Sequence, residues 1–524
     1  MRTLFKNGLL YDGSCNEPHN GDILIEDDCI AQISDIREET ADRVVDCTGL
    51  SITPGWIDAH SHNDFYYDRE NAETYFEPFL RQGITTQVTG NCGFSVFGVE
   101  PDSKYKQDVG GGLFHAVQSG SYAQFLQRAK GSLLVNMVPL IGHGTARISI
   151  SGLSPRKLDP AEKKRLVSLV DEAMAGGAFG GSFGFMYEPG MYAPMDELVD
   201  FASAVAKHDG ILTVHPRACS KMSMDYPLLS RPHIELALEE VLQIARTSKA
   251  KTEYSHLIFV GQTSWKCADR MLDMIRKARA EGVDIAYDNY SLCYGASVIT
   301  VICPAWYMAL DASKKRSAWV KARLRLMVNL SRKLLGIDYD DITVAWISPD
   351  HPEYEGRTIG EISRSCNRDP LEVYLELIEL SKGKGRVYLG KYYNEELIRR
   401  LMDDDLSVFM TDAWIEEAGV QNGAAYQCFP NFLVIAKENN IPLEKVINKM
   451  TGKTAERFSI PKRGFLRQGW YADLTIFDEK RLAVTLDKAD STPGGVMYTV
   501  VNGQFAVDNG TYRTQHAGAV LSKA

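Results

Sequence analysis

The sequence lacks the features of membrane and exported proteins. It has no run of about 18 uncharged apolar residues, so no transmembrane helix is expected. Residues 1–8 lack the apolar core of a secretory signal, so we expect no export. The ten cysteines are scattered without a Cys-x-x-Cys pair, which argues against a disulfide framework and favours buried thiols. These absences predict a cytoplasmic protein.

An excess of positive charge is also missing. The chain has 58 Lys and Arg against 68 Asp and Glu, which gives a net charge of −10. This balance argues against a nucleic-acid partner or an anionic membrane partner. One segment differs, because residues 314–333 are basic with apolar residues at helical spacing. A membrane-surface helix would show the same pattern, but we expect a solvated helix face because the whole chain is acidic.

Strand patterns are concentrated at both ends of the chain. The first 50 residues and residues 472–503 contain short apolar runs separated by turn residues such as Asn-Gly and Asp-Gly. The economical arrangement is one small β-sandwich domain made from residues 1–54 and 463–524. An α/β domain over residues 55–462 would then be inserted between these two parts.

The middle of the chain alternates strand and helix patterns. Eight short apolar strand candidates lie near 57–62, 85–92, 134–141, 180–185, 211–215, 251–256, 284–288 and 406–412. Eight such units predict an α/β fold of the (β/α)8 or TIM-barrel type. The interval from about 289 to 405 is too long for one crossover, so we expect an insertion near the barrel mouth.

Two histidines follow the first predicted strand, in the run Thr53-Pro54-Gly55-Trp56-Ile57-Asp58-Ala59-His60-Ser61-His62. A spacing of two residues on a strand places both imidazoles on one face. Two neutral imidazoles on one face suit a divalent transition metal, zinc above all. His60 and His62 are therefore candidate zinc ligands.

Similar residues end four other predicted strands. They are Cys92, His215, His256 and Asp412. Because chemistry in such barrels takes place at the carboxyl ends of the strands, we expect the six side chains to form one metal site or two adjacent sites. Zinc supplies hydroxide near neutral pH, and Asp412 is the carboxylate that could move its proton. A metal-bound hydroxide and a nearby carboxylate together predict hydrolysis of an amide, an imide or an ester.

Several segments match a known family. They include Gly90-Asn91-Cys92-Gly93, Leu140-Ile141-Gly142-His143-Gly144-Thr145, Val214-His215-Pro216-Arg217 and Tyr254-Ser255-His256-Leu257, besides the run that ends at His62. With these motifs the chain resembles the amidohydrolase superfamily, and within it the N-acyl-D-amino-acid deacylases (D-aminoacylases). The resemblance covers nearly the whole chain.

The resemblance implies specific roles for these residues. It implies a tight zinc site at Cys92, His215 and His256, and a second, often weaker site at His60, His62 and Asp412. Asp412 would be the general acid/base. Tyr290 matches a family tyrosine near the substrate, and His143 and Arg217 lie in family motifs that make them further candidates for substrate binding.

The chain departs from the family where the substrate carboxylate should bind. A family lysine that follows the histidine of the sixth strand is replaced here by Ile258. A family His-Pro-Arg stretch after the catalytic aspartate is also absent, and residues 422–430 occupy its place. Because an unpaired carboxylate is costly to bury, we expect a substrate that differs from simple N-acyl-D-amino acids.

The first hypothesis is therefore a zinc-dependent hydrolase of a C–N amide bond in a small-molecule substrate. One alternative is a cyclic amide or imide hydrolase of the hydantoinase or dihydroorotase type. The other is a non-catalytic binding protein on the same barrel. One or two metal ions, and a monomer or a homo-oligomer, are all compatible with the sequence.

Overall fold

Eight parallel strands form the centre of the computed structural model. The structure describes residues 1–34, 36, 41–110, 114, 118–223, 226–227, 231–308, 310–315 and 317–523. In order, they are β6 (Trp56–Asp58), β7 (Ile84–Thr89), β8 (Asn136–Gly142), β9 (Gly180–Gly184), β10 (Ile211–His215), β11 (Lys251–Tyr254), β12 (Ile285–Asn289) and β16 (Ser407–Phe409). The amide of Ala59 donates to the carbonyl of Phe409 at 3.1 Å and joins the last strand to the first. The predicted (β/α)8 barrel is confirmed.

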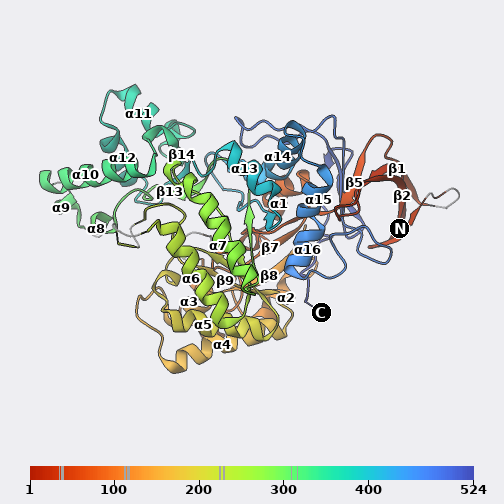
Figure 1. The fold of residues 1–524 in the computed structure, drawn as a ribbon, viewed down its shortest axis with the longest axis horizontal. Coiled ribbons are helices and arrows are strands. Elements are labelled where there is room, and N and C mark those ends of the chain that lie inside the picture. Colours follow the sequence, from red (N-terminus) through yellow and green to blue (C-terminus); the bar gives the residue numbers. More distant parts are fainter. Residues whose placement is uncertain are drawn as a thin grey trace.

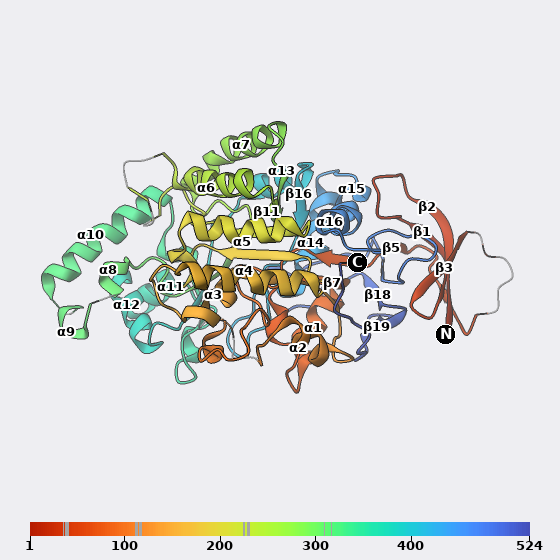
Figure 2. The ribbon, with the colours of Figure 1, turned by 90° about the horizontal axis from the view of Figure 1, so that it is seen from below.

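Helices cover the outside of this barrel. They include α1 (Ala72–Arg81), α3 (His143–Ser151), α4 (Pro160–Ala175), α5 (Met195–Lys207), α6 (His233–Ser248), α7 (Ala268–Ala280), α13 (Glu395–Asp403) and α14 (Ala424–Glu438). Figure 2 shows α4, α5, α6 and α7 side by side along the strands. Helix α4 begins at Pro160, because the Asp159 side chain before it accepts hydrogen bonds from the amides of Ala161 and Glu162.

Both ends of the chain share one continuous mixed sheet. Its nine strands are β1 (Arg2–Leu10), β2 (His19–Glu26), β3 (Cys29–Ser34), β4 (Arg43–Asp46), β5 (Ser51–Pro54), β17 (Leu474–Phe477), β18 (Val496–Val501), β19 (Gln504–Asp508) and β20 (Thr511–Tyr512). Antiparallel pairing of β5 with β17 joins the two ends. Phe5, Ile25, Ile476 and Phe505 lie in one apolar cluster that is separate from the barrel core. The expected β-rich unit from both termini is confirmed, and we propose 1–54, 55–462 and 463–524 as the domain limits.

The insertion leaves the barrel at the carboxyl end of β12. It contains an antiparallel sheet of β13 (Gly295–Val298), β15 (Arg386–Leu389) and β14 (Ile342–Trp346), with helices α8 (Ala305–Met308), α9 (Ala312–Lys315), α10 (Ala318–Leu335), α11 (Ile359–Cys366) and α12 (Pro370–Leu380). Figures 1 and 2 place it at the opposite end of the molecule from β1–β3. The predicted range 289–405 also includes α13, which packs on β16 and α14 as a helix of the barrel. Within the described residues, no helix is both long enough and apolar enough to cross a bilayer.

Candidate metal centre

The six predicted ligands lie at or just beyond the carboxyl ends of five barrel strands. His60 and His62 follow β6, Cys92 follows β7, His215 ends β10, His256 follows β11 and Asp412 follows β16. The structure brings all six together in two groups that could each hold a metal ion. The first group is His60, His62, Cys92 and Asp412, and the second is Cys92, His215 and His256. Cys92 belongs to both groups.

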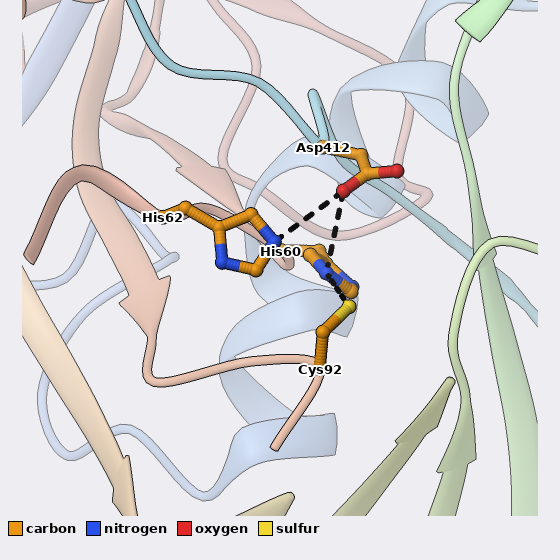
Figure 3. Close-up of side chains that lie close together, drawn as sticks. All are labelled: His60, His62, Cys92 and Asp412. Atoms are coloured by element: carbon orange, nitrogen blue, oxygen red, sulfur yellow. Dashed lines mark hydrogen bonds and ion pairs between the residues drawn. The ribbon is translucent and has the colours of Figure 1, made fainter. Parts of the chain in front are cut away.

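The first group is compact. The Oδ1 atom of Asp412 lies 3.5 Å from Nε2 of His60 and 3.6 Å from Nε2 of His62. The Sγ atom of Cys92 lies 3.3 Å from the same His60 nitrogen. Figure 3 shows these four side chains pointing toward one another. The imidazoles are buried, whereas the Asp412 side chain keeps 28% of its surface exposed.

The second group shares the sulfur. Sγ of Cys92 lies 3.4 Å from Nδ1 of His215 and 3.9 Å from Nε2 of His256. In a tetrahedral zinc site, sulfur and nitrogen ligand atoms are about 3.5 Å apart, from bond lengths of about 2.3 and 2.0–2.1 Å. The thiol, the imidazoles and their spacing therefore fit zinc.

Three of the ligands have a backbone conformation that non-glycine residues rarely adopt. The φ angles are 52° at Cys92, 37° at His256 and 47° at Asp412. The turn into Cys92 also requires Gly90, where φ is 81° and an added Cβ would lie 2.0 Å from the carbonyl oxygen of Leu140. Strained backbone of this kind is concentrated at functional sites, which agrees with a metal centre here.

The buried carboxylate of Asp58 joins the first and last strands of the barrel next to the first ligand group. Oδ1 of Asp58 accepts hydrogen bonds from the amide of Thr411 at 2.9 Å and from the amide of His60 at 3.2 Å. Its Oδ2 accepts one from the Thr411 hydroxyl at 2.7 Å. Asp58 thus links the segment carrying His60 to the residue before Asp412.

A second buried carboxylate, Asp288 at the end of β12, faces the histidines. Its Oδ1 accepts a hydrogen bond from the amide of His256. Its Oδ2 lies 3.7 Å from Nδ1 of His60, the ring nitrogen that points away from Asp412. Asp288 thus fixes the backbone of one ligand and lies near the ring of another, without a hydrogen bond to that ring.

Burial sets the ionisation of the ligands in the metal-free protein. It lowers the pKa values of His60, His62 and His256, and lowers that of His215 most strongly, so the imidazoles are neutral as metal binding requires. Burial, followed by Asp412 and Asp288, raises the pKa of the Cys92 thiol well above its usual value. Binding a metal ion would therefore release the Cys92 proton.

Asp412 remains a carboxylate. Burial raises the pKa of Asp412, but its electrostatic interactions with His60, His62 and His256 and the hydrogen bond from His62 lower the pKa by more, so the net pKa lies below the usual range. Among the described residues, no Lys or Arg forms an ion pair with Asp412 or Asp288. Within the described part of the chain, the side chains that form ion pairs with these two carboxylates are thus imidazoles.

The three predicted substrate-binding residues differ in their surroundings. Tyr290 is buried, packs on Tyr393 at a ring distance of 5.6 Å, and has its pKa raised by burial, by Tyr393 and Tyr392, and by Asp412. Tyr290 directly follows β12, the strand that carries Asp288. His143 is fully buried, and its Nε2 lies 3.0 Å from Glu197.

Arg217 is engaged in a salt bridge. Its guanidinium donates to both carboxylate oxygens of Glu240, at 3.0 and 2.9 Å, and to the carbonyl of Met191 at 3.0 Å. Ile258, which replaces the family lysine, is buried two residues after His256. A substrate anion would have to compete with Glu240 for Arg217.

Sequence reasoning missed three residues that contact the ligands. Asp58 has the same spacing from His60 as His60 has from His62, so the two-residue period of the strand could have identified it. Asp288 stands two residues before Tyr290 and carries the same signal. Tyr187 has no such signal, because it lies in a loop after β9, where its hydroxyl comes within 3.5 Å of Nδ1 of His215.

Comparisons with known proteins agree with this geometry. No family model matches the chain. The chain is 28% identical to the D-aminoacylase of Alcaligenes xylosoxydans xylosoxydans over 527 residues, or 99% of this chain and 97% of the relative. Solved structures of D-aminoacylase, one from a study of its binuclear metal centre, superpose with a TM-score of 0.79 at 24% identity over 99% of both chains. The N-acyl-D-glutamate deacylase of Bordetella bronchiseptica, complexed with zinc and a phosphonate inhibitor, gives 0.79 at 23% identity over 99% of both chains.

A near-closed parallel barrel with histidine, cysteine and aspartate ligands at its strand ends defines the class of metal-dependent amidohydrolases. Within this class, the chain is similar over nearly its full length to the D-aminoacylases. It is a D-aminoacylase-like, metal-dependent amidohydrolase. The resemblance predicted from the sequence motifs is confirmed.

Proposed function

We propose that this protein hydrolyses the C–N amide bond of a small-molecule substrate with zinc at the centre. The arrangement of Asp412 carries the proposal. Its carboxylate lies within 3.6 Å of two buried imidazoles but remains partly exposed, so it can reach a substrate. Cys92, His215 and His256 would hold one ion tightly, and His60, His62 and Asp412 would hold a second.

A zinc ion in such a site lowers the pKa of water toward about 7 and polarises a carbonyl oxygen. Asp412 is the catalytic residue of this chain. Its carboxylate accepts a proton from the attacking water as the water oxygen bonds to the amide carbon. Asp412 then gives that proton to the amide nitrogen as the C–N bond breaks, so the amine leaves neutral.

The substrate is proposed to lack a free α-carboxylate, or to hold it away from the position of Ile258. Two observations support this. The centre has no Lys or Arg partner among the described residues, and Arg217 is paired with Glu240. Tyr290 would contact the substrate. We also propose that the protein is cytoplasmic.

The acid/base role is tested with Asp412→Asn. We expect turnover to be abolished while zinc stays bound at the site of Cys92, His215 and His256, as measured by metal analysis. Asp487→Asn, an exposed aspartate near the C-terminus, is the matched control and should keep full activity. Full activity in Asp412→Asn would end the assignment.

The substrate is tested by assaying zinc-loaded protein on N-acyl-D- and N-acyl-L-amino acids, simple amides and cyclic imides. We expect neutral linear amides to be cleaved faster than N-acyl-D-amino acids. Preference for cyclic imides would favour the hydantoinase-like alternative. A purified chain without zinc, and without activity after metal is restored, would favour the non-catalytic alternative.

A further inference from the structure

Helix α10 of the insertion has two apolar stripes, and only one is buried. Val320, Leu324 and Val328 are at most 9% exposed and face the insertion's interior. The second stripe consists of Trp319, Leu326, Leu330 and Leu334, which are 67, 70, 52 and 46% exposed. At 100° per residue these four side chains fall within an arc of about 80°. Single exposed apolar residues are ordinary, but a continuous stripe marks an interaction surface.

The segment around the exposed stripe has no negative charge. Residues 312–337 contain eight Lys or Arg and no Asp or Glu, in a chain with a net charge of −10. Three of these cations have acidic partners, since Lys314 pairs with Asp311 at 3.1 Å, Arg325 pairs with Asp369 at 2.6 Å and Arg332 pairs with Asp338.

Other cations of α10 have no acidic partner in the described part of the chain. Lys321, Arg323 and Lys333 are exposed and form no ion pair there. Arg323 instead lies over the ring of Trp306 at 4.2 Å and that of Trp319 at 5.7 Å. Seen down the helix axis at 100° per residue, Arg323 falls inside the arc of the exposed stripe, and Lys333 lies about 20° outside its edge. Two cations without an acidic partner among the described residues, Arg323 and Lys333, therefore lie at the exposed apolar stripe, whereas Lys321 lies on the far side of the helix.

We propose that α10 docks this enzyme on an anionic lipid surface. Helices with an apolar stripe, a tryptophan and flanking Lys or Arg lie in the interface of anionic bilayers, where the apolar side chains enter the headgroup region and the cations meet phosphates. Figures 1 and 2 place α9 and α10 at the far end of the molecule, so a flat surface can reach them. This inference replaces the expectation of a merely solvated helix face.

A second copy of the chain fits this surface less well. A twofold contact would place the same patch of each subunit against the other. Arg323 and Lys333 at this patch would then face identical cations, and like charges across an interface are unfavourable. Charge complementarity thus favours lipid over self-association.

The proposal is tested by sedimenting the full-length protein with vesicles. We expect binding to vesicles of equal parts phosphatidylglycerol and phosphatidylcholine, no binding to pure phosphatidylcholine, and weaker binding when salt is raised, because exposed charges are screened. Leu326→Ser combined with Leu330→Ser should weaken binding at least about tenfold, since two apolar side chains no longer enter the interface. Arg323→Glu combined with Lys333→Glu should remove the preference for phosphatidylglycerol.

The matched control is Leu153→Ser combined with Leu486→Ser. These leucines are 39 and 46% exposed, are not part of α10, and their replacement should leave vesicle binding unchanged. The proposal is overturned if the wild-type protein does not sediment with phosphatidylglycerol vesicles, or if both leucine pairs have the same effect. It is also overturned if the wild type forms dimers that the Leu326 and Leu330 changes dissociate, because a second copy would then be the occupant.

Discussion

Cys92→Ser should weaken metal binding in both ligand groups at once. Cys92 is the one residue that the two groups share, and its sulfur lies 3.3–3.9 Å from His60, His215 and His256. His62→Ala removes a ligand from the first group alone, and His215→Ala removes one from the second group alone. The three variants should therefore give three different patterns of metal loss.

The size of the effect follows from the ligand count. Structural zinc sites bind with about 10–16 kcal/mol shared among about four ligands, so one ligand is worth about 3–4 kcal/mol, or roughly a 10²–10³-fold change in Kd. Cys92→Ser should show this loss for every bound ion. His62→Ala should show it for one ion and leave the ion held by Cys92, His215 and His256 nearly unchanged.

Metal content after gel filtration and competition with a chromophoric chelator would measure these changes. Cys47→Ser is the matched control, because Cys47 is also buried but lies in the core of the terminal sheet. Circular dichroism would verify that each variant is folded. Wild-type affinity for all ions in Cys92→Ser, or loss of the tight ion in His62→Ala, would refute the shared-sulfur arrangement.

Two further predictions concern buried carboxylates. Asp288→Asn should weaken metal binding about 10–100-fold, because its carboxylate holds the backbone amide of His256 and places a negative charge 3.7 Å from Nδ1 of His60; unchanged affinity in the same titration would contradict this. Glu197→Gln should destabilise the protein by about 3–5 kcal/mol at pH 7, because Glu197 is the buried partner of His143 and Arg147. Burial raises the pKa of Glu197, but His143 and Arg147 lower it below its usual value of 4.5. The wild-type advantage is therefore present above pH 4.5 and lost as the pH falls through the folded-state pKa. Urea unfolding at several pH values would test this, and a difference that is constant in acid would contradict it.

The barrel could be predicted because its strands carry a simple signal. Each of the eight predicted strand ranges overlaps an observed barrel strand. Parallel strands buried on both faces are short, continuous apolar runs, and most here are followed by a helical pattern. Since all strands of such a barrel point the same way, residues after them must gather at one end. This rule alone predicts that the six ligands, which are spread along the sequence from His60 to Asp412, lie close together in space.

The two faces of α10 could not be distinguished from the sequence. Val320, Leu324 and Val328 have helical spacing, and so do Trp319, Leu326 and Leu330. Periodicity identifies both stripes but cannot say which one packs on the protein, because tertiary contacts decide burial. The contacts of Asp288 also depend on tertiary structure, because its partners His256 and His60 follow β11 and β6 rather than lying on its own strand. The sequence pattern around Asp288 therefore does not identify them.

The centre is held in place by the surrounding fold rather than by its own preferences. Cys92, His256 and Asp412 each occupy the left-handed region, which costs about 1–3 kcal/mol per residue. Two of them, Asp412 and His256, donate backbone hydrogen bonds to neighbouring residues that maintain this geometry. The amide of Asp412 donates to the carbonyl of His60 at 3.0 Å, and the amide of His256 donates to Asp288. Because Asp58 also binds the amides of His60 and Thr411, the first and last barrel strands cannot shift independently. A metal ion would therefore meet ligands whose backbone is already positioned, so the cost of ordering them is met by folding and not by metal binding.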